Sequence, residues 1–154
     1  MGVFAFMNRE VVKKGKLAHE NAEIILINHD IETNLTFQQL TQLEEKEFTA
    51  IFDSSDSDPE EHSYTGIALI NILEDSGIAL DNIEQVMVRG IDGYTVALNP
   101  KEIEDEDNVY LAYKLNGKYL KGKERGGSGP YQLIIRKDIF SQRWCKFVVE
   151  IEIK

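Results

Sequence analysis

The pattern of hydrophobic and polar positions predicts a chain of short strands with few helices. Glu23–Asn28 (EIILIN) is a short apolar run typical of a buried strand, and Asn28–Asn34 is predicted to be the turn after it. In Lys46–Asp53 the apolar residues Phe48, Ala50 and Phe52 alternate with Glu47, Thr49 and Ile51. This pattern predicts a strand with one face better buried than the other. In Gly66–Ser76 apolar residues recur at helical spacing, and Gly77 is a suitable C-terminal cap. This segment is the clearest predicted helix.

Two further helical segments are indicated by the residues at their N-termini. Leu35–Leu43 is predicted to be a short helix in which Thr36 is the N-cap, and Gln39 completes a capping box. Asn99 followed by Pro100 places an N-cap before a proline at the first helical position. A single helical turn is therefore expected there.

The chain after Gly77 is predicted to be mostly β. The predicted strands are Gln85–Arg89, Tyr94–Leu98, Val109–Leu115, Lys118–Leu120, Gln132–Arg136 and Lys146–Ile153. Tight turns at Asp92-Gly93 and Asn116-Gly117 join two pairs of them, and Asp53–His62 and Gly126–Pro130 are predicted loops. The fold class that follows is α+β, with mixed sheets and a few short helices. We expect a single domain over residues 1–154, with residues 1–22 as an N-terminal extension.

The composition is typical of a globular domain. Of the 154 residues, 42% are hydrophobic and 29% are charged. The longest apolar stretches are far shorter than the ~20 residues that a membrane span requires, and the N-terminus lacks the basic region of a secretory signal. Cys145 is the single cysteine, which excludes an internal disulfide and indicates a reducing compartment. We therefore expect a cytoplasmic protein without a membrane span.

The charge is unevenly distributed along the chain. The whole chain has a net charge of −10, which argues against binding to nucleic acid or to an anionic membrane. Residues 1–80 contain 5 basic and 15 acidic residues, whereas residues 81–154 contain 12 of each. Within residues 114–146 nine basic residues stand against Glu124 and Asp138, a net charge of +7. This segment is either a set of solvated faces or a local site for an anion.

Motifs for metal binding and for nucleophilic catalysis are absent from the sequence. The acidic loop Asp53–His62 has Glu61 where a calcium loop needs glycine, and the three histidines have no zinc-ligand spacing. The chain has no nucleophile elbow, and a lone Cys145 in a strand is more often a packing residue than a catalytic one. The glycines in Gly126–Pro130 do not form a nucleotide-binding fingerprint. We therefore predict no catalytic residue and no metal ligand.

A series of short motifs resembles the sulfite-oxidase-like molybdopterin-binding domain family. Residues 64–77 (YTGIALINILEDSG) resemble the family's W-x-G-V-x-L-x-x-L-L-x-x-A-G stretch. The later matches, in order, are Asp92-Gly93-Tyr94, Val109–Tyr113 with Asn116-Gly117, Gly129–Leu133 and Trp144–Val148. The resemblance covers about Glu23–Lys154, and it implies the sulfite-oxidase-like molybdopterin-binding fold.

The departures from the family pattern bear on function. The enzymes of this family bind molybdenum through a cysteine thiolate on the loop before the W-x-G element, and residues 50–56 contain no cysteine. A metal–dithiolene centre prefers a thiolate to a hydroxyl or a carboxylate, so molybdenum is not expected. Tyr64 and Phe147 replace the family's tryptophans, and Gln132 replaces its arginine. Loss of that arginine removes a bidentate donor to phosphate or carboxylate.

The leading hypothesis from the sequence is a non-catalytic module that binds a pterin, molybdopterin or a similar anionic heterocycle. In this hypothesis Tyr64 and Tyr94 stack on the ring, and Asp92 accepts hydrogen bonds from its amine. Arg143 and Lys146 face a phosphate or carboxylate. Gln132, at the position of the family's arginine, completes the predicted cofactor-binding residues.

Two alternatives remain open at the level of the sequence. One is a molybdenum-cofactor-dependent oxidoreductase whose metal has a non-cysteine ligand. The other is a protein-interaction domain with a degenerate pocket that docks a partner protein. The interaction domain is favoured over ligand binding if Tyr64, Asp92, Tyr94 and Lys146 do not line one cleft, whereas the molybdenum content of the protein decides for or against the enzyme.

Overall fold

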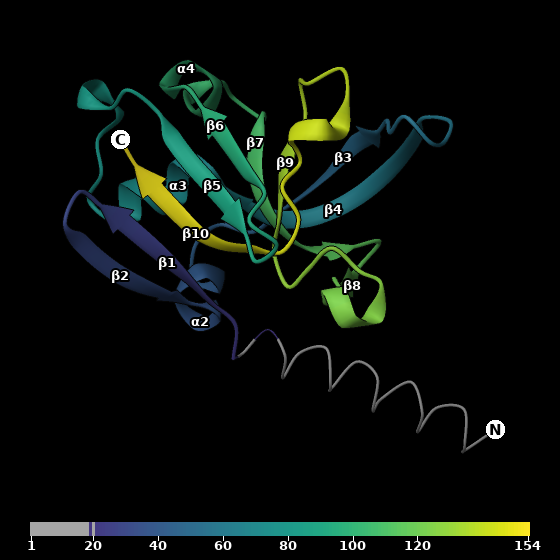
Figure 1. Cartoon of the computed structure of the whole chain (residues 1–154), viewed down its shortest axis with the longest axis horizontal. Helices are drawn as coiled ribbons and strands as arrows, with labels where there is room; N and C mark the ends of the chain where they lie inside the picture. The colour runs from purple at the N-terminus through teal and green to yellow at the C-terminus, as the bar shows by residue number, and fades with distance from the viewer. Residues whose placement is uncertain (1–18, 20) are drawn as a thin grey trace.

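Residues 19 and 21–154 are described by a computed structural model, in which the strands form two five-stranded sheets (Figure 1). The first sheet has the order β2-β1-β10-β5-β6, and only β1 and β10 are parallel to each other. Its strands are β1 (Glu23–Asn28), β2 (Ile31–Thr36), β5 (Val86–Gly90), β6 (Thr95–Leu98) and β10 (Val148–Ile153). The C-terminal strand therefore lies in the middle of this sheet.

The second sheet is antiparallel and has the order β3-β4-β7-β8, with β9 also paired to β7. Its strands are β3 (Lys46–Phe52), β4 (Glu60–Ala68), β7 (Val109–Leu115), β8 (Lys118–Tyr119) and β9 (Gln132–Ile135). The short helices are α2 (Phe37–Thr41), α3 (Leu69–Asp75) and α4 (Pro100–Glu104), and the 3-10 turns are η1 (Leu80–Asn82), η2 (Lys123–Arg125) and η3 (Ser141–Arg143). The predicted α+β class with mixed sheets and a few short helices is confirmed.

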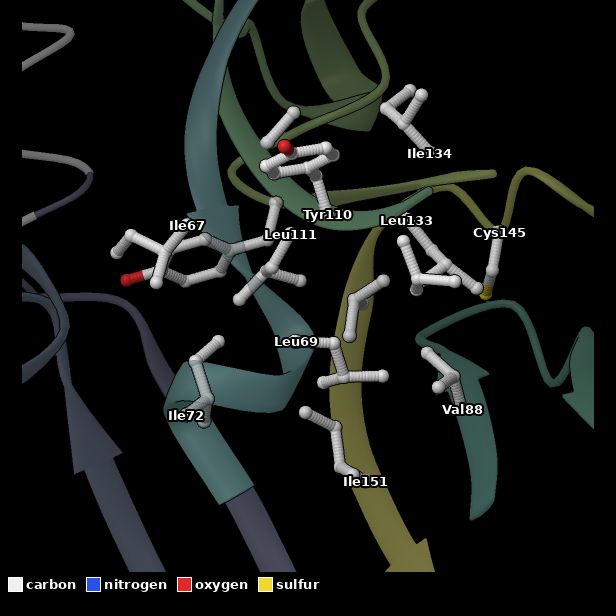
Figure 2. Packing of buried hydrophobic residues seen from close by; sticks show 14 of the residues in the cluster. Ile67, Leu69, Ile72, Val88, Tyr110, Leu111, Leu133, Ile134, Cys145 and Ile151 are labelled. Carbon is white, nitrogen blue, oxygen red and sulfur yellow. The ribbon is translucent and has the colours of Figure 1, made fainter. Parts of the chain in front are cut away.

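The hydrophobic core lies between the two sheets and includes one face of α3. Figure 2 shows Leu69 of α3 between Leu111 of β7 and Ile151 of β10, and Ile72 of α3 belongs to the same cluster. All four side chains are at most 1% exposed. Burial of a large aliphatic side chain contributes about 1.5–3 kcal/mol. This core joins the two sheets, and so it fixes the loops at their ends.

The predicted capping box at Thr36 and the predicted N-cap at Asn99 are both present, and Asn99 also forms a capping box. The Thr36 hydroxyl accepts a hydrogen bond from the Gln39 backbone N–H, and the Gln39 side chain accepts one from the Thr36 N–H. Asn99 and Glu102 are paired in the same way at the start of α4. These local motifs satisfy backbone donors that a helix leaves free at its N-terminus.

Two predicted boundaries are wrong. The turn predicted over residues 28–34 is only two residues long, because Ile31 already begins β2 and pairs with Asn28. The helix predicted over residues 66–76 begins at Leu69, because Gly66–Ala68 continue β4 and pair with β7. A short apolar run fits either a buried strand or a buried helix, and only the partner strand decides between them.

The other predicted strands and loops agree with the structure within a few residues. The predicted acidic loop 53–62 is shorter at its end, since β4 begins at Glu60. Gly77 has a φ of +76°, as expected for the residue after a helix. The predicted extension 1–22 lies largely outside the described residues, and a single domain over 1–154 stays a prediction. No helix among the described residues is long and apolar enough to cross a membrane.

Candidate functional site

A pocket of about 340 Å³ lies where three segments meet. The segments are the loop after β3, the turn between β5 and β6, and the stretch from η3 to β10. The lining residues are Phe52, Ser54, Ser55, Asp92, Tyr94, Ser141, Gln142, Trp144 and Lys146. We call it the Asp92 pocket. It brings together three of the six predicted site residues, Asp92, Tyr94 and Lys146.

The turn between β5 and β6 holds Asp92 and Tyr94 in place. Gly93 has a φ of +87°, a conformation that glycine adopts without strain. The Asp92 carboxylate accepts a hydrogen bond of 3.1 Å from the Tyr94 backbone N–H. The Tyr94 hydroxyl donates to the Gln142 carbonyl, which fixes the half-exposed ring at the rim of the pocket. One face of an aromatic ring and one carboxylate are thus available to a ligand.

Lys146 reaches the same pocket because the chain bends at the next residue. Phe147 has a φ of +56°, and two backbone hydrogen bonds of 2.9 Å hold it, one to Ser128 and one from Ile91. In consequence Lys146 lines the Asp92 pocket, whereas Phe147 lines a different one. Lys146 forms no ion pair within residues 19 and 21–154. Its ammonium group remains available as a donor.

The loop between β3 and β4 lies at the pocket and presents hydroxyl groups. Ser54 and Ser55 line the pocket, and the Ser54 Oγ lies 3.0 Å from the Ser57 Oγ. The Asp53 carbonyl accepts hydrogen bonds from the Ser141 N–H and Oγ, at 3.1 and 2.8 Å. These bonds tie the loop to η3. No sequence pattern points to Ser141 or Gln142 as pocket residues, because their partners are distant in the chain.

Tyr64 does not line the Asp92 pocket. Its side chain is 2% exposed and packs edge-on against Trp144, with 6.1 Å between the ring centroids. Burial raises the pKa of the Tyr64 hydroxyl to about 12, and the hydroxyl lies 3.2 Å from His62 Nδ1. Tyr64 therefore lies behind Trp144 and supports the pocket wall.

Gln132 and Arg143 also have other partners. The Gln132 side chain is buried in β9 and accepts a hydrogen bond of 2.8 Å from the Ser128 hydroxyl. The Arg143 guanidinium donates to Asp138 at 2.8 and 2.9 Å and to Glu102 at 2.6 Å. The two carboxylates raise the pKa of Arg143, Asp138 having the larger effect. Neither residue lines the Asp92 pocket, and a ligand role for Tyr64, Gln132 or Arg143 stays a prediction without support from this geometry.

Cys145 lies next to the pocket but its thiol faces the core. The Sγ atom is 3.7 Å from the Tyr94 carbonyl, and Figure 2 shows it among buried side chains that include Leu133 and Val88. Burial, with a smaller effect of the Asp92 charge, raises the pKa of this thiol to about 12. At neutral pH the group is therefore a neutral packing residue, as its isolated position in the sequence predicts.

We expect the Cys145 thiol to be unreactive in the folded protein. A chromogenic disulfide reagent at pH 8 should modify it more than ~100-fold more slowly than a denatured sample, because the thiolate fraction is depressed and access is blocked. The denatured sample should release one equivalent. Rapid modification of the folded protein at the denatured rate would contradict this assignment.

The structure is a small α+β domain with a candidate ligand pocket, and comparison with known proteins gives the family. A sequence profile of the oxidoreductase molybdopterin binding domain matches residues 25–154. The chain therefore belongs to this family. No curated protein is significantly similar in sequence.

The fold comparison agrees with the family. The crystal structure of the sulfane dehydrogenase SoxCD from Paracoccus pantotrophus superposes with a TM-score of 0.71 at 17% identity. The match covers 88% of this chain and 38% of that chain. The predicted sulfite-oxidase-like molybdopterin-binding fold is thus confirmed, while the chain spans only part of the length of this relative.

The family implies a molybdopterin-type cofactor, whose metal would need a soft thiolate ligand at the pocket. The described residues contain no group of three or more His, Cys, Asp or Glu side chains that could hold a metal ion. The nearest thiol, Cys145, is neutral and points into the core. Ser54 and Ser55 offer hard oxygen atoms, whereas a metal–dithiolene centre prefers a soft thiolate. The pocket residues therefore do not fit the metal of such a centre.

Proposed function

We propose that the chain is a non-catalytic ligand-binding module of the molybdopterin-binding fold, and that the Asp92 pocket binds a pterin. One observation carries this proposal: Asp92 and Tyr94 of the β5–β6 turn and Lys146, more than fifty residues later in the chain, line a single pocket. A pterin ring has an amine donor edge, a carbonyl acceptor and a flat face. The Asp92 carboxylate can accept from the amine, the Lys146 ammonium can donate to the carbonyl, and the Tyr94 ring can stack on the face.

The test is calorimetric titration with a tetrahydropterin and with molybdopterin. We expect heat from the intact protein, and at least a tenfold weaker dissociation constant for Asp92→Asn and Lys146→Met, because charge-assisted hydrogen bonds contribute about 1.5–3 kcal/mol. Asp92→Asn is the sharper variant, since an amide oxygen can still accept from the Tyr94 N–H. Lys101→Met, on the exposed face of α4, serves as the matched control. Absence of heat with every pterin would refute the proposal.

The second candidate is an oxidoreductase that uses the molybdenum cofactor with a non-cysteine ligand. Family membership favours it, and Ser54 and Ser55 line the pocket with hydroxyl oxygens that would have to serve as the metal ligand. The deciding measurement is metal analysis of protein purified from a cofactor-producing host. Molybdenum in stoichiometric amount would support the enzyme and contradict the non-catalytic module.

A partner protein is also part of the proposal. Ile139 and Phe140 are 80% and 55% exposed and directly precede the pocket residues Ser141 and Gln142. Exposed apolar side chains beside a ligand pocket are suited to protein contact. We propose a reducing compartment such as the cytoplasm for this module, on the basis of the single buried thiol, and no nucleic acid partner.

A further inference from the structure

A second pocket, of about 470 Å³, lies at the β7–β8 hairpin and η2. Figure 1 shows β8 on the side of the sheets away from the yellow η3 turn. Residues next to each other in the chain line the two pockets. Ile91 and Phe147 face the second pocket, whereas their chain neighbours Asp92 and Lys146 face the first. The second pocket is therefore a distinct site, which we call the basic pocket.

Positive charge is concentrated around the basic pocket. Its cations are Lys114, Lys118, Lys121, Lys123 and Arg125, and its single carboxylate is Glu124. None of the five cations forms an ion pair with any residue that the structure describes. Arg89 and Arg143, in contrast, are each paired with two carboxylates. Five of the nine cations of the +7 segment thus gather, without ion pairs, where a hollow is available to an anion.

The walls of the basic pocket are apolar. They are formed by Ile91, Leu120, Pro130, Phe147 and Val149, together with the aliphatic parts of the lysines. Ile91 is 68% exposed, a large apolar surface for a position beside five cations. These walls suit a ligand with an apolar body rather than a bare inorganic anion.

Phe147 is held in a conformation that an aromatic residue rarely adopts. Its φ of +56° is in the left-handed region, which costs about 1–3 kcal/mol for a non-glycine residue. The backbone hydrogen bonds to Ser128 and Ile91 maintain it. The ring lines the basic pocket, and the Lys123 Nζ lies 5.7 Å from its centroid. An apolar surface and a cation are thereby fixed side by side.

We propose that the basic pocket binds an organic anion with an apolar body, of the class of a medium-chain carboxylate. The carboxylate would lie among the five cations and the alkyl chain against Phe147, Ile91 and Leu120. The net charge of −10 disfavours long polyanions and anionic surfaces, which meet the whole field of the protein. A small anion meets chiefly the local excess of positive charge, because charges more than ~8 Å away are screened at physiological ionic strength.

The test uses dodecanoate as the probe, in calorimetry and in displacement of the fluorescent anion anilinonaphthalene sulfonate. We expect dodecanoate to bind with a dissociation constant below about 1 mM, and dodecanol and inorganic phosphate to bind at least tenfold more weakly. Binding should weaken as sodium chloride is raised. Equal affinity for dodecanol, or no binding of dodecanoate, would overturn the proposal.

Variants locate the site. Lys121→Gln/Arg125→Gln should weaken dodecanoate binding at least tenfold, while Lys101→Gln/Lys154→Gln, with the same change of net charge, should alter it less than twofold. Phe147→Asn removes the ring with a residue that tolerates positive φ, and should also weaken binding. An equal loss in the control variant would overturn the location.

Two further measurements separate this site from the alternatives. Vesicles of phosphatidylglycerol present an anionic headgroup on a surface, and we expect no co-sedimentation with them. Binding to vesicles but not to free dodecanoate would contradict a small-ligand pocket. The Lys121→Gln/Arg125→Gln variant should retain tetrahydropterin binding. The proposals for the two pockets can therefore be refuted independently of each other.

Discussion

Replacing Gly66 with alanine is expected to lower the free energy of unfolding by about 3 kcal/mol or more, because overpacking a tight contact displaces backbone. A Cβ atom at Gly66 would lie 2.4 Å from the Leu111 carbonyl oxygen and 2.7 Å from the Ala112 Cα. Both atoms belong to β7, which pairs with β4 at this point, where the register also shifts. Neither strand can move without separating the sheet from the core. Urea denaturation followed by circular dichroism measures the loss.

The matched control for this prediction is Gly122→Ala. The only contact of a Cβ there is the flexible end of the Glu124 side chain at 3.0 Å, and the backbone is in the extended region. We expect a change within about 0.5 kcal/mol, as for surface substitutions generally. If the Gly66→Ala variant had the same free energy of unfolding as the natural protein, the close approach of β4 and β7 would not contribute to stability.

Replacing Trp144 with alanine is expected to cost about 3–5 kcal/mol of stability. The side chain is 3% exposed, and its ring centroid lies 6.1 Å from those of both Tyr64 and Phe52. The indole N–H donates a hydrogen bond of 3.0 Å to the Ile135 carbonyl at the end of β9. Removal of the indole leaves a cavity behind the Asp92 pocket and a buried carbonyl without its donor.

Two substitutions separate these contributions. Trp144→Phe keeps a ring but removes the donor to Ile135, so we expect an intermediate loss of about 1–3 kcal/mol. Phe140→Ala changes a half-exposed aromatic residue in the same loop and should cost less than about 1 kcal/mol. A Trp144→Ala variant no less stable than Phe140→Ala would show that the pocket wall is not part of the core. Thermal and denaturant unfolding both give the comparison.

Features that depend on neighbouring residues could be predicted from the sequence. The capping boxes at Thr36 and Asn99 involve residues three positions apart, and both are present. The Asn116-Gly117 turn supplies the two positive φ angles that a tight hairpin needs. The order of the motifs gave the family. The capping boxes and the turn depend on residues a few positions apart, and the family depends on the order of motifs along the sequence.

The helix boundary at Leu69 could not be found in this way. Apolar residues continue without interruption from Gly66 into α3. The sequence pattern of a buried strand and that of a buried helix both fit such a run. The preceding residues become strand because Gly66 lets the β7 backbone approach closely. That approach depends on residues more than forty positions later in the sequence.

For the same reason, only some of the residues that line the candidate pocket could be named from the sequence. Asp92 and Tyr94 belong to one turn, and Lys146 joins them because Phe147 bends the chain. Tyr64 and Arg143 are ordinary candidates by residue type, but the fold places Trp144 in front of the first and two carboxylates around the second. Residue type gives the possible chemistry, whereas burial and partners decide whether it is available.

The sequence by itself determined the α+β class, the family and the absence of a cysteine on the loop before β4. It also located the basic stretch, but not whether its charges were dispersed or gathered. Tertiary structure decided that five of the nine cations of this stretch surround one apolar hollow and that Cys145 is buried as a neutral thiol. It also decided that Asp92, Tyr94 and Lys146 share a pocket. The physical reason is that motifs act through local hydrogen bonds and backbone angles. The burial of a side chain, and the meeting of side chains from distant segments in one pocket, depend on how the two sheets pack.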